Sequence, residues 1–244
     1  MSHLSRILAI QLKNRPISIV FSRFLALEKY QYFFRVSVIM LIEHKSTPLQ
    51  WGSLDLALFG LEKDWYGNEL DTPAAFGMAI DHGSFWFVAT RRKPANIHPQ
   101  ARPGEFTPEL WKLDVAEFFL SHPESGRYLE FNLAPNGAWW SAEFTAPRVR
   151  ANEEDVEMPG VKTFSDLAPD GTWVAAASIP LDILKARFDF GAETRMNVTF
   201  IVDSPNQKFL TAAAAPDGEP DFHRPDVFKQ VKIHEGGLTF HNPQ

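Results

Sequence analysis

The sequence predicts an all-β fold: an antiparallel β-sandwich of jelly-roll or immunoglobulin-like type with one short helix. Three observations support this class. Short apolar segments follow one another closely, turn-forming residues separate them, and no long helical pattern alternates with them. A hydrophobic content of 45% in 244 residues is enough for a substantial core, and sandwiches of this size often form one domain.

The first half of the chain supplies several strand patterns. Residues 53–58 alternate Leu with polar or small residues, which predicts a strand. Apolar segments at 76–80 and 85–88 flank the turn sequence Asp-His-Gly-Ser at 81–84, and we expect a hairpin because its glycine can supply a positive φ. Residues 91–108 contain four prolines, which predict an irregular crossing loop.

The middle of the chain contains the strongest hairpin signal. Strands are predicted at 115–120, 128–133 and 138–144, and the dipeptide Asn136-Gly137 joins the last two. The following residues, 145–171, are acidic and punctuated by Pro and Gly. We expect a solvated loop there.

The last third of the chain contains the expected helix. A strand is predicted at 173–179, and Pro180 then suits the first turn of a short helix over 181–185. Further strands are expected at 196–202, 209–213 and 228–233.

Charge is distributed unevenly along the chain. The net charge is -6, yet residues 1–39 hold six basic residues against one acid, and the remainder holds 18 basic and 29 acidic residues. The acidic body disfavours nucleic acid and anionic ligands and leaves neutral molecules or cations. We interpret residues 1–39 as a basic extension, either a non-native start or a disordered or helical segment, before a single domain at 40–244.

Export and membrane signals are weak. No apolar run in residues 1–39 reaches the ~20 residues of a transmembrane span, and charges interrupt the run that a secretory signal needs. The sequence leaves the compartment open, with the cytoplasm favoured over export. The absence of Cys excludes disulfides, thiolate metal sites and Cys nucleophiles. Nothing in the sequence indicates an oligomeric state.

Three stretches follow one another in an order and spacing that resemble a known family. Residues 110–120 contain a Trp followed by Asp-x-x-Glu-x-Phe, residues 128–137 contain an apolar strand and a Pro-Asn-Gly turn, and residues 220–228 lead into the last strand. Over roughly residues 50–234 the chain resembles the family 9 carbohydrate-binding modules and related DOMON-like domains. The resemblance implies a DOMON-like sandwich that clamps a sugar between two aromatic rings.

The resemblance also implies particular site residues. Trp111 matches the first clamp tryptophan, Glu117 matches an acceptor for sugar hydroxyls, and the second aromatic ring is expected near Phe222 or His223, where this chain lacks Trp. Sugar C–H faces stack on electron-rich rings, and a carboxylate accepts hydroxyl hydrogen bonds strongly. Trp111 and Glu117 would lie about 20 Å apart in a straight strand, so the chain has to bend, for example near Asp114.

Two further candidates come from the residues themselves. Trp139 and Trp140 point to opposite faces of one strand, so we expect one in the core and the other exposed as a binding platform. Trp139 is the candidate ligand-binding residue. Arg224 belongs to a polar cluster with Asp221 and His223. The alternative interpretations are packing at the sandwich edge for Trp111, a structural ion pair or a hydrogen-bonded acid for Glu117, and a loop tied by an Asp–Arg pair for the cluster.

We therefore expect a non-catalytic domain that binds a neutral carbohydrate in an aromatic-lined cleft. The alternatives are a DOMON-like haem or redox domain and a sandwich that mediates protein interaction. An enzyme is disfavoured because the sequence shows no nucleophile elbow, phosphate loop, zinc motif or recognisable carboxylate pair. No cofactor is expected: calcium at acidic residues 153–157 is an alternative, and haem would need an axial ligand such as Met78 or Met196, which no spacing singles out.

Overall fold

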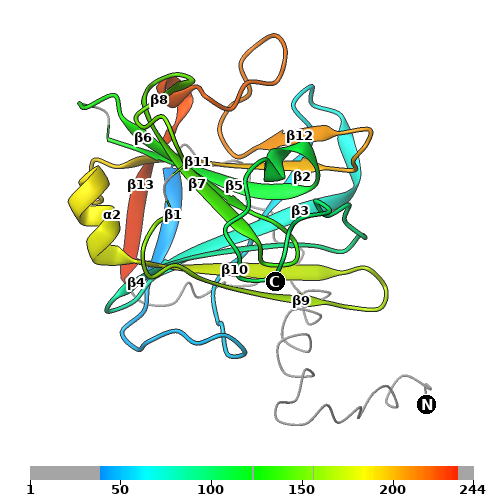
Figure 1. The fold of residues 1–244 in the computed structure, drawn as a ribbon, viewed down its shortest axis with the longest axis horizontal. Coiled ribbons are helices and arrows are strands. Elements are labelled where there is room, and N and C mark those ends of the chain that lie inside the picture. The colour runs from blue at the N-terminus through cyan, green and yellow to red at the C-terminus, as the bar shows by residue number, and fades with distance from the viewer. Residues whose placement is uncertain (1–38, 123, 156, 236–244) are drawn as a thin grey trace, which may run out of the picture.

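The computed structural model describes residues 39–122, 124–155 and 157–235. These residues form a β-sandwich with one α-helix, α2 (Leu181–Phe188), at one end (Figure 1). The strands are β1 (Ile39–His44), β2 (Phe59–Lys63), β3 (Glu69–Ile80), β4 (Ser84–Arg91), β5 (Val115–Ser121), β6 (Tyr128–Leu133), β7 (Trp139–Ala146), β8 (Val149–Arg150), β9 (Lys162–Leu167), β10 (Trp173–Pro180), β11 (Arg195–Val202), β12 (Lys208–Thr211) and β13 (Lys229–Glu235).

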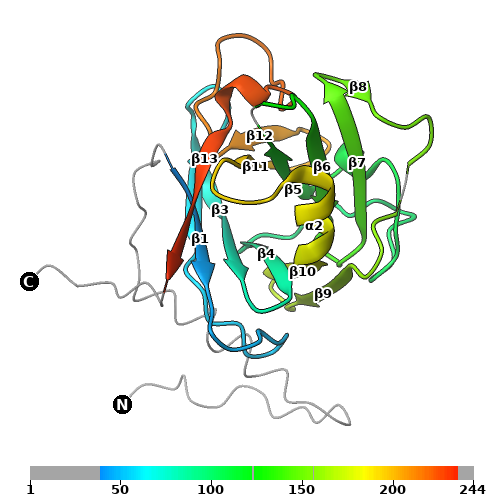
Figure 2. The same ribbon diagram turned by 90° about the vertical axis from the view of Figure 1, so that its left-hand side faces the viewer.

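The sandwich has two layers joined through β13. One layer has the order β8-β7-β6-β5-β11, with β12 also paired to β11, and the other has the order β1-β3-β4-β10-β9, with β2 paired to β3. β13 pairs with both β11 and β1, and it lies beside β1 in Figure 2. The all-β sandwich is confirmed. β1 adds parallel pairings with β13 and β3 to an otherwise antiparallel arrangement.

The main core lies between the two layers. Phe118 of β5 stacks on Phe131 of β6 at 5.1 Å between ring centroids, and its edge meets Phe87 of β4 at 5.2 Å. Leu184 and Phe188 of α2 are buried in the same core, so the short helix closes one end of the sandwich. Strand alternation places Phe87, Phe118 and Phe131 inward, because successive residues of a strand point to opposite faces.

The segment 53–58 is not a strand, contrary to our prediction; β2 begins only at Phe59. The segment crosses the outer face of β4 and β10, where Leu54 packs with Trp86 and Val88. The amide of Ala57 donates to the carboxylate of Glu43 instead of to a neighbouring strand. Alternating Leu residues therefore mark a segment that covers a sheet face without joining the sheet.

The prediction of a loop at 145–171 is also partly wrong, because this segment contains β8 and β9. β9 pairs with β10 along its whole length and leaves its other edge unpaired. Phe164 is its one aromatic residue and stacks against Trp51 and Trp86 at 5.5 and 5.9 Å. An edge strand that buries so little apolar surface gives a weak pattern in the sequence.

Both predicted hairpins form, by different means. Gly137 has φ +84° and turns β6 into β7, as the Asn-Gly signal predicts. Gly83 is not among the residues of positive φ, so our reason for the β3–β4 turn was wrong. There the Asp81 carboxylate holds the turn by accepting hydrogen bonds from the amides of Gly83 and Ser84.

The basic extension at 1–39 lies outside the described residues, except for Ile39 at the start of β1. Within the described ranges, no helix combines the length and apolarity that crossing a membrane requires.

A buried ion pair ties the two layers together. Arg91, at the end of β4, is buried, and its Nη1 donates to Asp203 Oδ1 at 2.7 Å just beyond β11. Lys93 Nζ lies 3.0 Å from the same oxygen. Burial alone would raise the pKa of Asp203, but hydrogen bonds from Arg91 and Lys93 and their positive charges hold it far below its usual range.

Replacing Asp203 by Asn should destabilise the sandwich by about 3 kcal/mol, because it removes the carboxylate that lies nearest to the buried Arg91 guanidinium. Since the carboxyl pKa is depressed on folding, this contribution is complete above the unfolded value of about 3.9 and fades as pH falls below it. Urea unfolding at pH 7 and at acid pH measures both effects. Asp71→Asn is the matched control, because exposed Asp71 lies 3.9 Å from the same guanidinium; an equal loss in both variants would contradict the layer-tie interpretation.

Candidate functional site

A groove of about 430 Å³ lies on the outer face of the layer that contains β5, β6, β7 and β11. Its volume falls within the range of about 300–1,000 Å³ typical of small-molecule pockets. Its lining combines aromatic rings with buried carboxyl groups and two arginines. The lining residues are Trp111, Glu117, Phe119, Glu130, Trp140, Phe144, Arg148, Arg150, Ile201, Gln207, Phe209, Pro220, Phe222 and His223.

Strand alternation positions the floor of the groove. On β5, Glu117 and Phe119 face the groove while Phe118 between them faces the core. On β6, Glu130 faces the groove while Phe131 packs in the core. The same strands therefore build the core and the floor, and neither can shift without the other.

Trp111 reaches the groove because the chain bends, as predicted, before β5 begins. It lies in the 3₁₀ turn η2 (Leu110–Lys112), and the Asp114 carboxylate holds the bend by accepting from the amides of Ser204 and Asn96 at 2.8 and 3.1 Å. The Trp111 ring packs on Trp140 at 4.8 Å between centroids. Trp111 and Glu117 thus line one groove.

A second aromatic group borders the groove. Phe222 lies 6.0 Å from Phe209 of β12 and 6.4 Å from Phe119, measured between ring centroids. The Trp65 ring packs against Phe222, with 6.0 Å between ring centroids, and its indole N–H donates a hydrogen bond to Gly218 O. Phe222 and His223, both predicted near the second ring of the clamp, therefore do lie in the groove.

Two other predicted residues lie elsewhere. Trp139 packs in the core, stacked on Phe131 at 5.5 Å, and its neighbour Trp140 borders the groove instead. Both tryptophans are buried, so the expected exposed platform on this strand does not exist. Arg224 pairs with the adjacent Asp226 at 2.7 Å and is not part of the groove lining.

Two buried carboxyl groups share the floor. Glu117 keeps 2% and Glu130 keeps 5% of its surface exposed. In the β5–β6 register Glu117 lies opposite Asn132 and Glu130 opposite Phe119, so the two acids are diagonal neighbours on one face. Thr199 Oγ1 of β11 donates to Glu117 Oε2 at 2.8 Å.

Burial sets the protonation of this pair. It raises the pKa of Glu117 to about 7 against the opposing hydrogen bond from Thr199. Burial and the charge of Glu117 together raise the pKa of Glu130 well above its usual range. Near neutral pH the pair therefore holds at least part of a proton and titrates as a unit.

A hydrogen-bond chain fixes His223 beside the pair. The Tyr128 hydroxyl accepts from the amide of Arg148 at 3.0 Å, which leaves its own proton for His223 Nδ1 at 2.8 Å. His223 Nε2 then carries the ring proton toward Glu130 Oε2, 3.5 Å away. Burial, followed by the charge of Arg148, lowers the pKa of His223 to about 4, so the ring is neutral at pH 7.

The two arginines of the groove already have anionic partners. Arg148 Nη2 lies 2.7 Å from Asp221 Oδ1, and Arg150 pairs with Asp155. The Arg150 guanidinium also lies over the Trp140 ring at 5.2 Å. Asp155 accepts a hydrogen bond from the Trp140 indole at 2.7 Å, so Trp140, Arg150 and Asp155 form one closed cluster.

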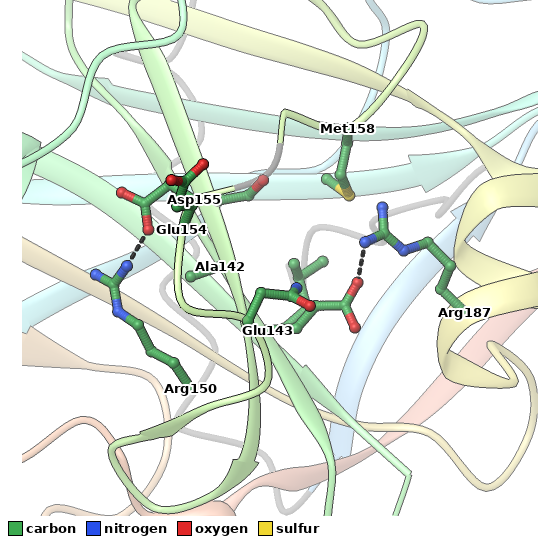
Figure 3. A pocket seen from close by; sticks show the side chains of 10 residues that line it. Ala142, Glu143, Arg150, Glu154, Asp155, Met158 and Arg187 are labelled. Atoms are coloured by element: carbon green, nitrogen blue, oxygen red, sulfur yellow. Dashed lines mark hydrogen bonds and ion pairs between the residues drawn. The ribbon is translucent and has the colours of Figure 1, made fainter.

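Arg150 also lines a second pocket. In Figure 3, Arg150 and Arg187 stand on opposite sides of it, and Arg187 forms an ion pair with Glu143. Its volume of about 10 Å³ is roughly the room of a single water molecule. The pocket is therefore too small for an organic ligand.

Asp155, Met78 and Met196 lie in surroundings that the structure describes. Among the described residues, no three His, Asp or Glu side chains gather in a group that could hold a metal ion. In the acidic stretch, Asp155 is paired with Arg150. Met78 and Met196 are both buried in the core between the layers.

Several groove residues were missed by sequence reasoning, chiefly Glu130, Phe119 and Phe209. Glu130 had a usable signal. Residues 128–133 alternate polar or aromatic side chains with apolar ones, and the hairpin register then puts Glu130 on the same face as Glu117. Phe209 had none, because its place depends on how β12 pairs with β11.

The fold of this chain is that of the family 9 carbohydrate-binding modules. No protein-family model matches the chain. Two structures of such a module from Caldicellulosiruptor kristjanssonii, in complex with glucose and with cellotriose, superpose with TM-scores of 0.53 and 0.54 at 12% and 13% identity. They cover 83% and 84% of this chain and the whole of the module.

Two further proteins are similar. A candidate carbohydrate-binding protein from Bacteroides uniformis superposes with a TM-score of 0.58 at 15% identity, covering 80% of this chain and 98% of the other. A protein of Arthroderma benhamiae named "Extracellular protein" is 27% identical over 139 residues, or 50% of this chain. The match spans 62% of that relative's length.

We predict that His223 stays neutral as the Nε2–H tautomer at pH 6. The Tyr128 hydroxyl occupies Nδ1, and burial opposes protonation of the ring. Nitrogen-15 NMR of the imidazole distinguishes the two tautomers and the imidazolium. An Nδ1–H signal, or a charged ring at pH 6, would show that the hydrogen-bond chain runs differently.

Proposed function

We propose that this chain is a non-catalytic carbohydrate-binding domain that holds a neutral sugar in the groove. One observation carries the proposal: aromatic rings and buried carboxyl groups converge on a single groove of suitable volume. The sandwich is also one on which the modules from Caldicellulosiruptor kristjanssonii hold glucose and cellotriose. A shared fold does not fix a shared ligand, so the proposal depends on the groove itself.

The aromatic residues suit the faces of a sugar ring. Trp111 packs with Trp140, Phe209 packs with Phe222, and no ring contact among the described residues joins the two groups. A pyranose between them would place its weakly positive C–H faces against electron-rich rings. In this proposal Trp111 supplies the main stacking surface, and Phe222 supplies a smaller one than a second tryptophan would.

The carboxyl pair suits the edge of the ring. With a raised pKa, Glu130 can donate a hydrogen bond through its proton, while an ionised Glu117 accepts from a sugar hydroxyl. Each hydroxyl both donates and accepts, so one protonated and one ionised carboxyl complement it.

The positions of the carboxyl groups favour binding over hydrolysis. Glycosidases place their two carboxyl groups on either side of the scissile bond. Glu117 and Glu130 instead lie side by side on adjacent strands of one sheet face. A sugar above that face meets both acids from the same side, so neither of the two acids is placed to attack while the other protonates the leaving oxygen.

We expect Trp111→Ala to weaken cellotriose binding roughly thirtyfold, or about 2 kcal/mol, because it removes the stacking surface. Tryptophan fluorescence and calorimetric titration of the full chain measure the change. Trp51→Ala is the matched control, since Trp51 packs on Phe164 on the outer face of the other layer. No saturable response of the folded wild-type chain to glucose, cellotriose or a wider sugar panel would reject the proposal.

A further inference from the structure

The floor of the groove presents more hydrogen-bond acceptors than donors. Glu117 accepts only from Thr199, so its Oε1 has no donor among the described residues. Glu130 accepts from Asn132 Nδ2 at 3.2 Å and faces His223 Nε2 at 3.5 Å. Asn132 Oδ1 is buried next to them without any hydrogen-bond partner. An unfilled acceptor in a buried place, such as Asn132 Oδ1, is costly unless a ligand supplies a donor.

Among the described residues, no side chain that is positively charged at pH 7 forms an ion pair with Glu117 or Glu130. Of the charged groups around it, Arg148 is bound to Asp221 and Arg150 to Asp155. His223 is neutral, because its ring is buried and Tyr128 donates to Nδ1. Within the described part of the chain, the floor is therefore an acidic site without a counterion, inside a groove bordered by aromatic rings.

An ammonium group has the chemistry that this floor lacks. It carries three donors and one positive charge, so it can bond to both carboxylates at once. Aromatic faces attract cations as well as sugar C–H groups. A neutral hydroxyl offers one donor and no charge, and it leaves the two acids sharing a proton.

We propose that the groove prefers an amino sugar to the neutral sugar of the same shape, with the ammonium group seated between Glu117 and Glu130. This preference rests on the proposed function of the groove. It names a positively charged carbohydrate as the ligand class. The ammonium group replaces the proton that the pair holds in the free protein, so binding releases a proton to the solvent.

The test compares two β-1,4-linked trimers, cellotriose and the glucosamine trimer, by calorimetry on the full chain at pH 6, where the amines of the free glucosamine trimer already carry their protons. We expect the glucosamine trimer to bind about tenfold more tightly, which corresponds to about 1.4 kcal/mol. Repeating the titration in buffers of different ionisation enthalpy should reveal proton release with the glucosamine trimer and little with cellotriose. The N-acetylated trimer, which lacks the charge, should also lose the preference.

Variants locate the effect. Glu130→Gln should reduce the ratio of the two affinities to near one, because it removes one of the two charges that hold the ammonium group. Asp226→Asn is the matched control: it removes one acid from the segment that follows His223, outside the groove, where Asp226 is paired with Arg224, and should leave the ratio unchanged. Thermal unfolding monitored by circular dichroism verifies that each variant is folded.

The outcomes separate the two proposals. Binding of cellotriose with no gain for the glucosamine trimer and no proton release overturns the amino-sugar preference and leaves carbohydrate binding intact. Binding of neither trimer overturns both. A preference that survives Glu130→Gln but is lost in Asp226→Asn would assign it to the overall acidic charge and overturn the seat between the two acids.

Discussion

The pairing of β5 with β6 and β11 constrains everything else in this molecule, because each of these strands has to satisfy two different faces. The inner face packs Phe118 and Phe131 against the opposite layer, and the outer face presents Glu117 and Glu130 to the groove. A shift of one residue in register would move the carboxyl groups into the core and the rings into the groove. The core therefore protects the geometry of the floor.

Burying two acids on that floor is unfavourable for folding unless something compensates. The structure offers partial compensation from Thr199, Asn132 and His223, all neutral, and the remaining cost appears as raised pKa values. The contrast with the Arg91–Asp203 pair is informative, since there the buried charges neutralise each other and the Asp203 pKa falls. A purely structural role would favour the second arrangement, so the only partly compensated floor supports the proposed role in ligand binding.

Much of the fold was predictable because it follows from local patterns. Short apolar segments between turn residues identified β5, β6 and β11, and the Asn136-Gly137 turn set the register of the β6–β7 hairpin. The wrong predictions concern segments whose local pattern does not reflect their place in the fold. Residues 53–58 alternate like a strand but only cover a sheet face. β9 is too polar for its sequence to indicate a strand. Trp139 and Trp140 show the same limit, because alternation separates them but only the assembled layers decide which borders the groove.

The residues of the candidate site come from two kinds of segment, paired strands and the loops or turns between them. The acids come from central strands, whereas Trp111 comes from the turn before β5 and Phe222 from the segment before β13. Hydrogen bonds fix that first segment: Asp114 holds the bend, and Gln207 donates to Lys112 O at 3.1 Å. Loops tolerate substitution better than paired strands, so under the proposed function the shape of the ligand depends on segments that are freer to vary. The charge of that ligand would then depend on β5 and β6, whose inner faces pack in the core.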